Sequence, residues 1–118
     1  LKEALQNPAG FVVVEAAVAL CRVGEGRAEA AEKVRQVMDA PGEAAQLAIE
    51  AVARMGEAGK PLVPAALAKL TSDNPDARFG AVTLVASLPP AEAAKVAPDV
   101  GRLLTDPEKK VRVRAAAV

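Results

Sequence analysis

The chain has 118 residues, of which fifteen are basic and fifteen acidic, so that the formal net charge is zero; 52% of the residues are hydrophobic and only 2% are aromatic. A chain of this length forms one domain, and its alanine-rich apolar content favours closely packed helices over a β-sandwich. The balanced charge gives no overall field to attract a polyanion, and the absence of histidine excludes Ser-His-Asp and Cys-His catalysis and the HExxH zinc motif.

Helical periodicity and turn residues predict four helix pairs, each made of a helix A, a turn and a helix B. The A helices are expected to end near Gln6 and to span about 27–38, 61–70 and 92–104. The B helices are expected to end near residues 23, 55 and 88, and the fourth to continue through Val118. The chain is therefore a single domain with repeat units at about 1–24, 25–56, 57–90 and 91–118.

The turns between helices A and B combine helix N-cap candidates with proline near the first helical position. They are Asn7-Pro8, Asp39-Ala40-Pro41-Gly42, Asp73-Asn74-Pro75-Asp76 and Asp106-Pro107-Glu108. Glycine- or proline-rich joints, at 24–26, 56–59 and 89–90, end the B helices. Pro64 and Pro98 each lie six residues before a leucine that closes helix A, and this shared position predicts either a kink or the true first turn of that helix.

A motif recurs about every 33 residues and has the form V-R-x-x-A-A-x-A-L-x-x-L-G. Its arginine position is occupied by Val13, Ala45, Arg78 and Arg112, at spacings of 32, 33 and 34 residues. The copies that begin at Ala77 and at Val111 fit best. The ankyrin motif needs histidine and the tetratricopeptide motif needs Trp and Tyr, all of which the chain lacks.

The repeat resembles the HEAT family in its short bacterial form. This resemblance implies an all-α, armadillo-like α-solenoid of about four HEAT-like helix-turn-helix repeats with truncated terminal helices. In HEAT repeats, the turn Asp and the Arg early in helix B commonly form a ladder of hydrogen bonds from one repeat to the next. Asp73 with Arg78, and Asp106 with Arg112, match that pattern and are expected to be structural, while Val13 and Ala45 leave the ladder incomplete.

No catalytic, metal-binding or cofactor-binding site is expected. Cys21 lies in an apolar run and is expected to be buried. The carboxylate pairs Glu29/Glu32 and Asp73/Asp76 are better explained by surface solvation and capping, and the glycine-rich joints lack the Gly-Lys-Ser/Thr ending of a phosphate-binding loop. The apolar run from Phe11 to Cys21 is too short to cross a bilayer. The sequence gives no indication of the compartment.

The expected function is a non-catalytic interaction or scaffolding module that binds a protein or peptide along the solenoid surface. In HEAT proteins the B helices line the concave face. Polar B-helix residues form a mixed-charge stripe suited to such a partner, namely Glu15, Arg22, Glu50, Arg54, Thr83, Ser87 and Arg114.

Two alternatives remain: an accessory domain of a larger enzyme, and a nucleic-acid-binding HEAT-like module. The basic cluster of Lys109, Lys110, Arg112 and Arg114 supports the second. The scarcity of aromatic residues disfavours it, because only Phe11 and Phe79 are present, both at apolar helix positions. The chain begins and ends within repeat units and is expected to be part of a longer one. Leu1, Leu5 and the helix at 111–118 should expose apolar surface that permits self-association.

Overall fold

A computed structural model describes residues 10–24 and 26–118, and this part of the chain consists of helices and turns without a strand. The first A helix and the turn Asn7-Pro8 predicted from the sequence lie outside the described residues. Short 3-10 segments, named η, extend several of the helices. The elements in chain order are α1 (Gly10–Val23), α2 (Arg27–Met38), α3 (Glu43–Ala51), η2 (Val52–Arg54), η3 (Gly56–Leu62), α4 (Val63–Leu67), η4 (Ala68–Thr71), α5 (Pro75–Ala86), α6 (Pro90–Ala94), α7 (Ala97–Arg102), η5 (Leu103–Thr105) and α8 (Lys109–Ala116).

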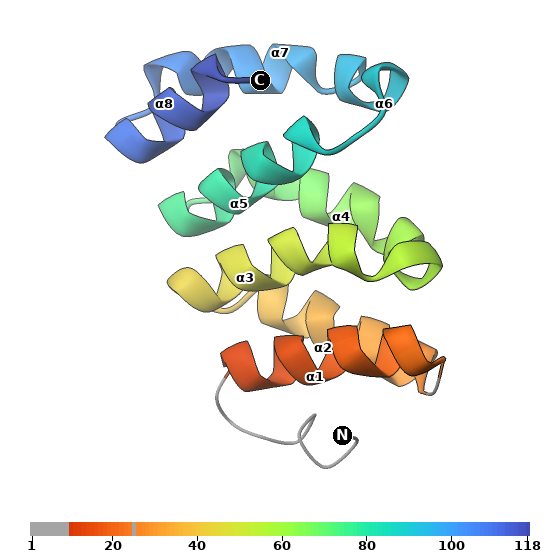
Figure 1. The fold of residues 1–118 in the computed structure, drawn as a ribbon. Helices are drawn as coiled ribbons and strands as arrows, with labels where there is room; N and C mark the ends of the chain where they lie inside the picture. Colours follow the sequence, from red (N-terminus) through yellow and green to blue (C-terminus); the bar gives the residue numbers. More distant parts are fainter. Residues whose placement is uncertain (1–9, 25) are drawn as a thin grey trace.

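The helices are arranged in successive layers (Figure 1). The B helices α1, α3, α5 and α8 follow one another along one side, and each packs against the next. The A helices α2, α4 and α7 lie behind them. We call α2 with α3 and η2 the second unit, η3 through α5 the third unit, and α6 through α8 the fourth unit.

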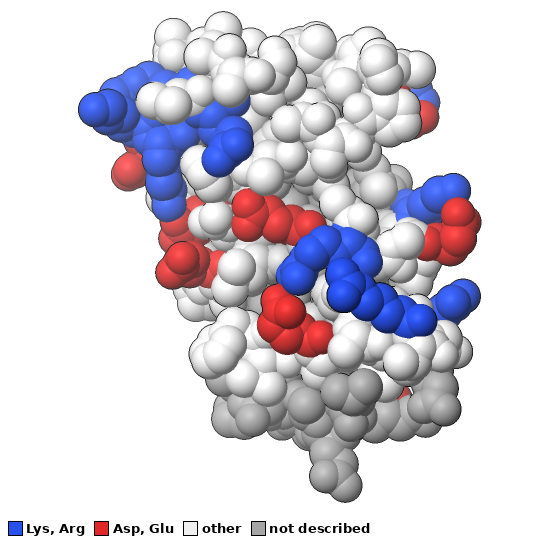
Figure 2. Space-filling model, in the orientation of Figure 1, with Lys and Arg blue, Asp and Glu red and all other residues white. Residues whose placement is uncertain are grey.

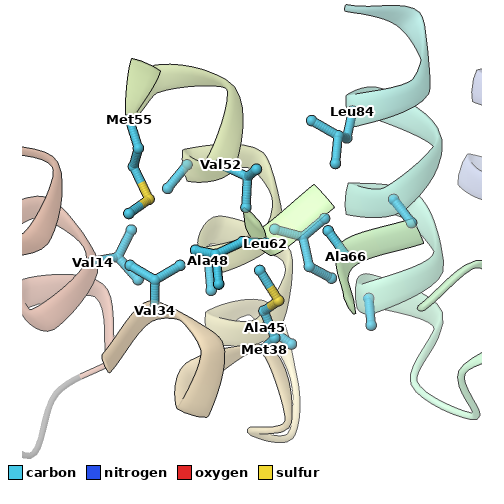
Figure 3. Packing of buried hydrophobic residues seen from close by; sticks show 14 of the residues in the cluster. Val14, Val34, Met38, Ala45, Ala48, Val52, Met55, Leu62, Ala66 and Leu84 are labelled. Carbon is cyan, nitrogen blue, oxygen red and sulfur yellow. The ribbon is translucent and has the colours of Figure 1, made fainter. Parts of the chain in front are cut away.

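One apolar core runs continuously through the layers. Figure 3 shows Val14, Val34, Met55 and Leu62 converging from neighbouring helices in its central part. Many of the buried positions on the B helices are alanines, which permit close helix packing; those with no exposed surface are Ala17, Ala45, Ala48, Ala51 and Ala81.

The backbones of α3 and α5 come close together at Gly80. A Cβ atom added there would lie 3.0 Å from both Cα and O of Gln46, so a larger residue would push the two backbones apart. Small residues, mostly alanine, therefore allow the helices of adjacent units to pack closely, as the composition predicts.

The prolines shared by the third and fourth A helices each lie near the start of an α-helical segment. Pro64 lies in the first turn of α4 and Pro98 in the first turn of α7, where the missing N–H has no helical partner to lose. The predicted A helix at 61–70 instead begins at Gly56 as a 3-10 helix, and the predicted helix at 92–104 is interrupted at Lys95 and Val96. The interruption comes just before Pro98, whose ring prevents a continuous helix.

The turns into the B helices differ in how they are capped. Asn74 caps α5 by accepting the N–H of Asp76 at 3.0 Å, with Pro75 as the first helical residue, as the sequence predicts. Gly42 and Glu108 precede α3 and α8 without a side-chain cap. Asn74 also donates to the carbonyls of Ala40 and Gly42, at 3.4 and 3.1 Å, and so joins consecutive turns.

Candidate functional site

The outward side of the B helices, which we call the B face, presents charges of both signs. Figure 2 shows basic and acidic side chains side by side across it. The polar residues predicted for partner binding lie on these helices or on the segments that directly follow them. They are Glu15 and Arg22 in α1, Glu50 in α3, Arg54 in η2 after α3, Thr83 in α5, Ser87 directly after α5, and Arg114 in α8. The structure does not gather them into one cluster, because they are spread over four layers.

Two of these residues are paired with each other. Arg54 Nη2 lies 2.9 Å from Glu15 Oε1 and joins η2 to α1, with both side chains largely exposed. The hydrogen bond from Arg54 lowers the pKa of Glu15. An exposed ion pair of this kind contributes little to the free energy of unfolding. Either side chain could therefore leave the other and bind a partner molecule at a small cost in stability.

Three further members of the stripe make bonds within their own helix. The hydroxyl of Thr83 donates to the carbonyl of Phe79 at 3.0 Å, and that of Ser87 donates to Leu84 at 2.8 Å. Glu50 accepts from Gln46 at 3.4 Å. Their hydroxyl and carboxylate oxygens retain acceptor capacity toward the solvent.

A hollow of about 550 Å³ opens on the B face between α5 and α8. Its floor is apolar and its rim is cationic. Half-buried Phe79 lies at its base, with the Arg114 guanidinium 5.0 Å and the Lys110 ammonium 5.6 Å from the centre of the ring. The remaining lining residues are Lys109, Val113 and Ala117.

The hollow joins the predicted residue Arg114 to residues that the sequence did not place in a site. Lys110 also pairs with Asp76 at the start of α5. An apolar floor beside the guanidinium of Arg114 suits an apolar side chain next to a carboxylate, because the guanidinium attracts the charge while the ring covers the apolar group. The basic cluster at 109–114 was the available signal, but its position over Phe79 depends on how α8 packs on α5. Phe11, also expected at an apolar position, is instead 59% exposed on α1.

Of the predicted arginine ladder, the described residues contain one arginine–carboxylate pair, and it joins Arg78 to Asp106. Arg78 donates Nε and Nη2 to the two carboxylate oxygens of Asp106 in the next unit, at 2.7 and 3.0 Å. The side chains are 13% and 4% exposed. Burial raises the pKa of Asp106, but the hydrogen bonds from Arg78 and from the N–H of Glu108 outweigh it, and the pKa is lowered.

The other residues expected in the ladder, Asp73 and Arg112, do not take part in a carboxylate pair among the described residues. Asp73 is exposed, and no described residue pairs with it. Arg112 contacts Asp106 through the backbone: its Nη1 donates to the carbonyls of Asp106 and Pro107, at 2.7 and 3.1 Å. Arg78 makes the equivalent bond to the carbonyl of Ser72 at 2.8 Å. Ser72, and not Asp73, is therefore the counterpart of Asp106.

Cys21 and Glu32, for which the sequence predicts no catalytic or metal-binding role, lie in the core and on the surface respectively. Cys21 is buried, and burial raises the pKa of its thiol, with the nearby Arg27 opposing the shift. Glu32 accepts from Arg35 at 2.8 Å on the surface of α2. Within residues 10–24 and 26–118, no three potential ligands converge to hold a metal ion. Over the same ranges, no helix has the length and apolar character needed to cross a bilayer.

No family model, curated protein or solved structure matches the chain. The internal repeats and the geometry of the B face are therefore the features that bear on its function.

Proposed function

We propose that the chain is a HEAT-like α-solenoid that acts, without catalysis of its own, as a docking module for a protein or peptide partner. The partner lies along the B face and is anchored in the hollow between α5 and α8. The layered packing of helix pairs and the equivalent contacts of Arg78 and Arg112 support the repeat assignment. The observation that carries the binding proposal is the guanidinium of Arg114 over the half-buried ring of Phe79, in a hollow between α5 and α8.

The chemistry of the hollow specifies a segment with an apolar side chain next to Asp or Glu. Aromatic and arginine side chains dominate the binding energy of many interfaces, and here one of each is in contact. The mixed charges along the rest of the B face would set the register of a longer partner rather than supply most of its affinity.

A nucleic-acid partner fits this surface less well. Of the basic cluster at 109–114, Lys110 pairs with Asp76 and Arg112 donates to two backbone carbonyls, so two of the four cations are engaged within the protein. The chain has no net positive charge. Affinity for DNA depends mainly on phosphate contacts made by such cations.

A peptide-display selection on the full chain tests the proposal. We expect enrichment of peptides in which an apolar residue adjoins one or more carboxylates. The affinity of a selected peptide, measured by fluorescence anisotropy, should fall about tenfold or more in Arg114→Glu, because an attractive charge becomes repulsive. Arg35→Glu changes the net charge equally on exposed α2 and should leave the affinity unchanged.

Three results would contradict this assignment. The selection could enrich no sequence class, or the selected peptides could bind Arg114→Glu as tightly as they bind the unmodified chain. The third is tight binding of duplex DNA at physiological ionic strength that Arg114→Glu abolishes, since this would favour the nucleic-acid alternative.

A further inference from the structure

A second hollow lies at the joints, beside the C-terminal ends of the second and third B helices. We call this hollow the joint groove. It has a volume of about 540 Å³ and opens among the end of η2, the 3-10 helix η3 and the joint that follows α5. Helices α1 and α2 precede it in the stack, and α6 through α8 follow it (Figure 1). The joint groove is therefore formed by interior layers of the stack.

The floor and walls of the joint groove are apolar. Val52 in η2 and Leu84 in α5 are nearly buried and lie at its floor, and half-buried Val63 and Leu88 line its sides. Its volume is within the range of about 300–1,000 Å³ that is typical of ligand-binding clefts. Apolar atoms of a partner would be removed from water there, which favours binding.

The rim of the joint groove carries more negative than positive charge. Of the described residues that line it, Glu57, Lys60 and Glu92 are charged. Glu57 pairs with Lys60 at 2.8 Å, and Glu92 pairs at 3.5 Å with Lys95, which does not line the groove. All four side chains are exposed, and exposed pairs are weak. Either carboxylate can therefore accept a cation from a partner.

The helix that ends at the joint groove adds to its negative potential. Helix α5 has 12 residues and no basic residue in its last turn, and the C-terminal end of a helix dipole is negative. Pro89 and Pro90 follow α5 and have no N–H to donate to the carbonyls at that end. At the end of η2, Arg54 pairs with Glu15 of α1 and does not line the groove. The groove therefore favours a cation next to apolar atoms.

One stripe of α5 connects the joint groove to the hollow over Phe79. Phe79, Thr83 and Ser87 follow one another at intervals of four residues and so lie on the same side of the helix. Phe79 lines the hollow and Ser87 lines the groove. The distance between them along the helix is about 12 Å, at about 1.5 Å per residue. An extended peptide covers this distance in about four residues, at about 3.3 Å each.

We propose that the joint groove binds a Lys or Arg side chain of the same partner whose apolar and acidic residues occupy the hollow between α5 and α8. This inference rests on the proposed function and specifies the partner further. The aliphatic stem of the Lys or Arg packs on Val52 and Leu84, and its charged end lies near Glu92 and Glu57. A purely apolar ligand would gain nothing from these carboxylates. The acidic end of the partner then lies toward α8 and its basic end toward the joints.

The positions of basic residues in the peptides selected on the full chain test this inference. We expect Lys or Arg about four residues from the apolar residue, always on the same side of it. The affinity of a selected peptide, measured by fluorescence anisotropy, should fall about fivefold in Glu92→Lys, because an attractive charge becomes repulsive. Glu29→Lys is the matched control: Glu29 is also an exposed residue in the first turn of a helix, α2, and its replacement should leave the affinity unchanged.

Two further changes separate the charge from the apolar contact. Ala53 is exposed on η2 and lines the joint groove, so Ala53→Arg places a cation and its aliphatic stem in the groove and should also weaken binding. A peptide in which the basic residue is replaced by Gln should lose about the same factor in affinity as Glu92→Lys causes. Glu92→Lys should then cause little further loss, because the peptide no longer has a cation to repel.

The outcomes distinguish this inference from the proposed function. Peptides that bind Glu92→Lys as tightly as the unmodified chain, but lose affinity in Arg114→Glu, would overturn this inference alone. A weakened affinity in Ala53→Arg would not rescue it, because the occupant of the groove would then be an apolar side chain. Enriched peptides without a basic residue at this spacing would overturn it as well. A selection that enriches no sequence class would refute the proposed function and this inference together.

Discussion

The ion pair between Arg78 and Asp106 should be the most sensitive polar contact in the protein. Both side chains are nearly buried, and two hydrogen bonds join them, so that removing either one leaves its partner without compensation. Breaking a buried pair costs about 3–5 kcal/mol, and the residual exposure of Arg78 places Arg78→Met near the lower end, at about 3 kcal/mol. That is a large part of the ~5–15 kcal/mol that stabilises a typical domain.

Replacing both partners with apolar residues should be less harmful than replacing one. In Arg78→Met with Asp106→Leu no buried charge is left unpaired. The remaining losses are the turn hydrogen bond to the N–H of Glu108 and the bond from Arg78 to the carbonyl of Ser72, each worth about 1 kcal/mol. The free energy of unfolding can be measured by urea denaturation followed with far-UV circular dichroism, because the chain has no Trp or Tyr for fluorescence.

Arg35→Met is the matched control, since its ion pair with Glu32 is exposed to solvent and should contribute little to stability. A coupling energy between Arg78 and Asp106 below about 0.5 kcal/mol would refute the reasoning, because residues in direct contact should couple more strongly than that. A single-variant cost as small as that of Arg35→Met would refute it too.

Three further predictions follow from single contacts. The lowered pKa of Asp106 means that its contribution to stability is complete above the ordinary carboxyl pKa of about 3.9 and is lost as the pH falls through the folded-state value, so acid unfolding of Asp106→Asn should show a smaller loss over that range. Gly59→Ala places a Cβ atom 2.2 Å from the carbonyl oxygen of Val52 and should lower the free energy of unfolding by about 3 kcal/mol, as measured by thermal unfolding. The control Gly101→Ala places its Cβ atom where no other atom lies within 4 Å, and it should stabilise α7 by about 0.5–1 kcal/mol. Arg54→Gln should cost about 0.5 kcal/mol or less at low salt and nothing measurable at high salt; a larger cost, or one that salt does not reduce, would contradict the exposed pair in the structure.

The bounds of a helix could be predicted where the spacing of apolar residues and the glycine or proline residues at its ends indicate the same bounds. The second A helix has the predicted bounds, Arg27–Met38, because Gly26 precedes it and its buried residues recur at helical spacing. The predicted break at Gly56 is confirmed by its positive φ of 61°. The 3-10 helix that follows was missed, because a glycine-rich stretch looks like a loop when its tertiary contacts are unknown.

The ladder partners could not be assigned from the sequence. The repeats have unequal lengths, so Asp73 looked like the counterpart of Asp106, and the true counterpart, Ser72, lacks the expected carboxylate. Phe11 was misplaced for a related reason: α1 is apolar on nearly every side, and its periodicity therefore does not identify the outer face. The hollow over Phe79 depends on the packing of α8 on α5, which a linear pattern does not encode.

The links between consecutive turns have a mechanical consequence. At the turn edge, directional bonds join the units: Asn74 to the carbonyls of Ala40 and Gly42, and Arg78 to Asp106. At the opposite edge, where the joints lie, the largely apolar joint groove of about 540 Å³ opens among the end of η2, the 3-10 helix η3 and the joint that follows α5.

A stack that is fastened along one edge by short directional bonds and along the other by apolar contact should bend more easily than it stretches. Distances between spin labels placed across the joints should accordingly have broader distributions than distances across the turns. The distances between units would then stay nearly constant along the turn edge. The distances between units at the joints would vary, and this variation would change the curvature of the stack.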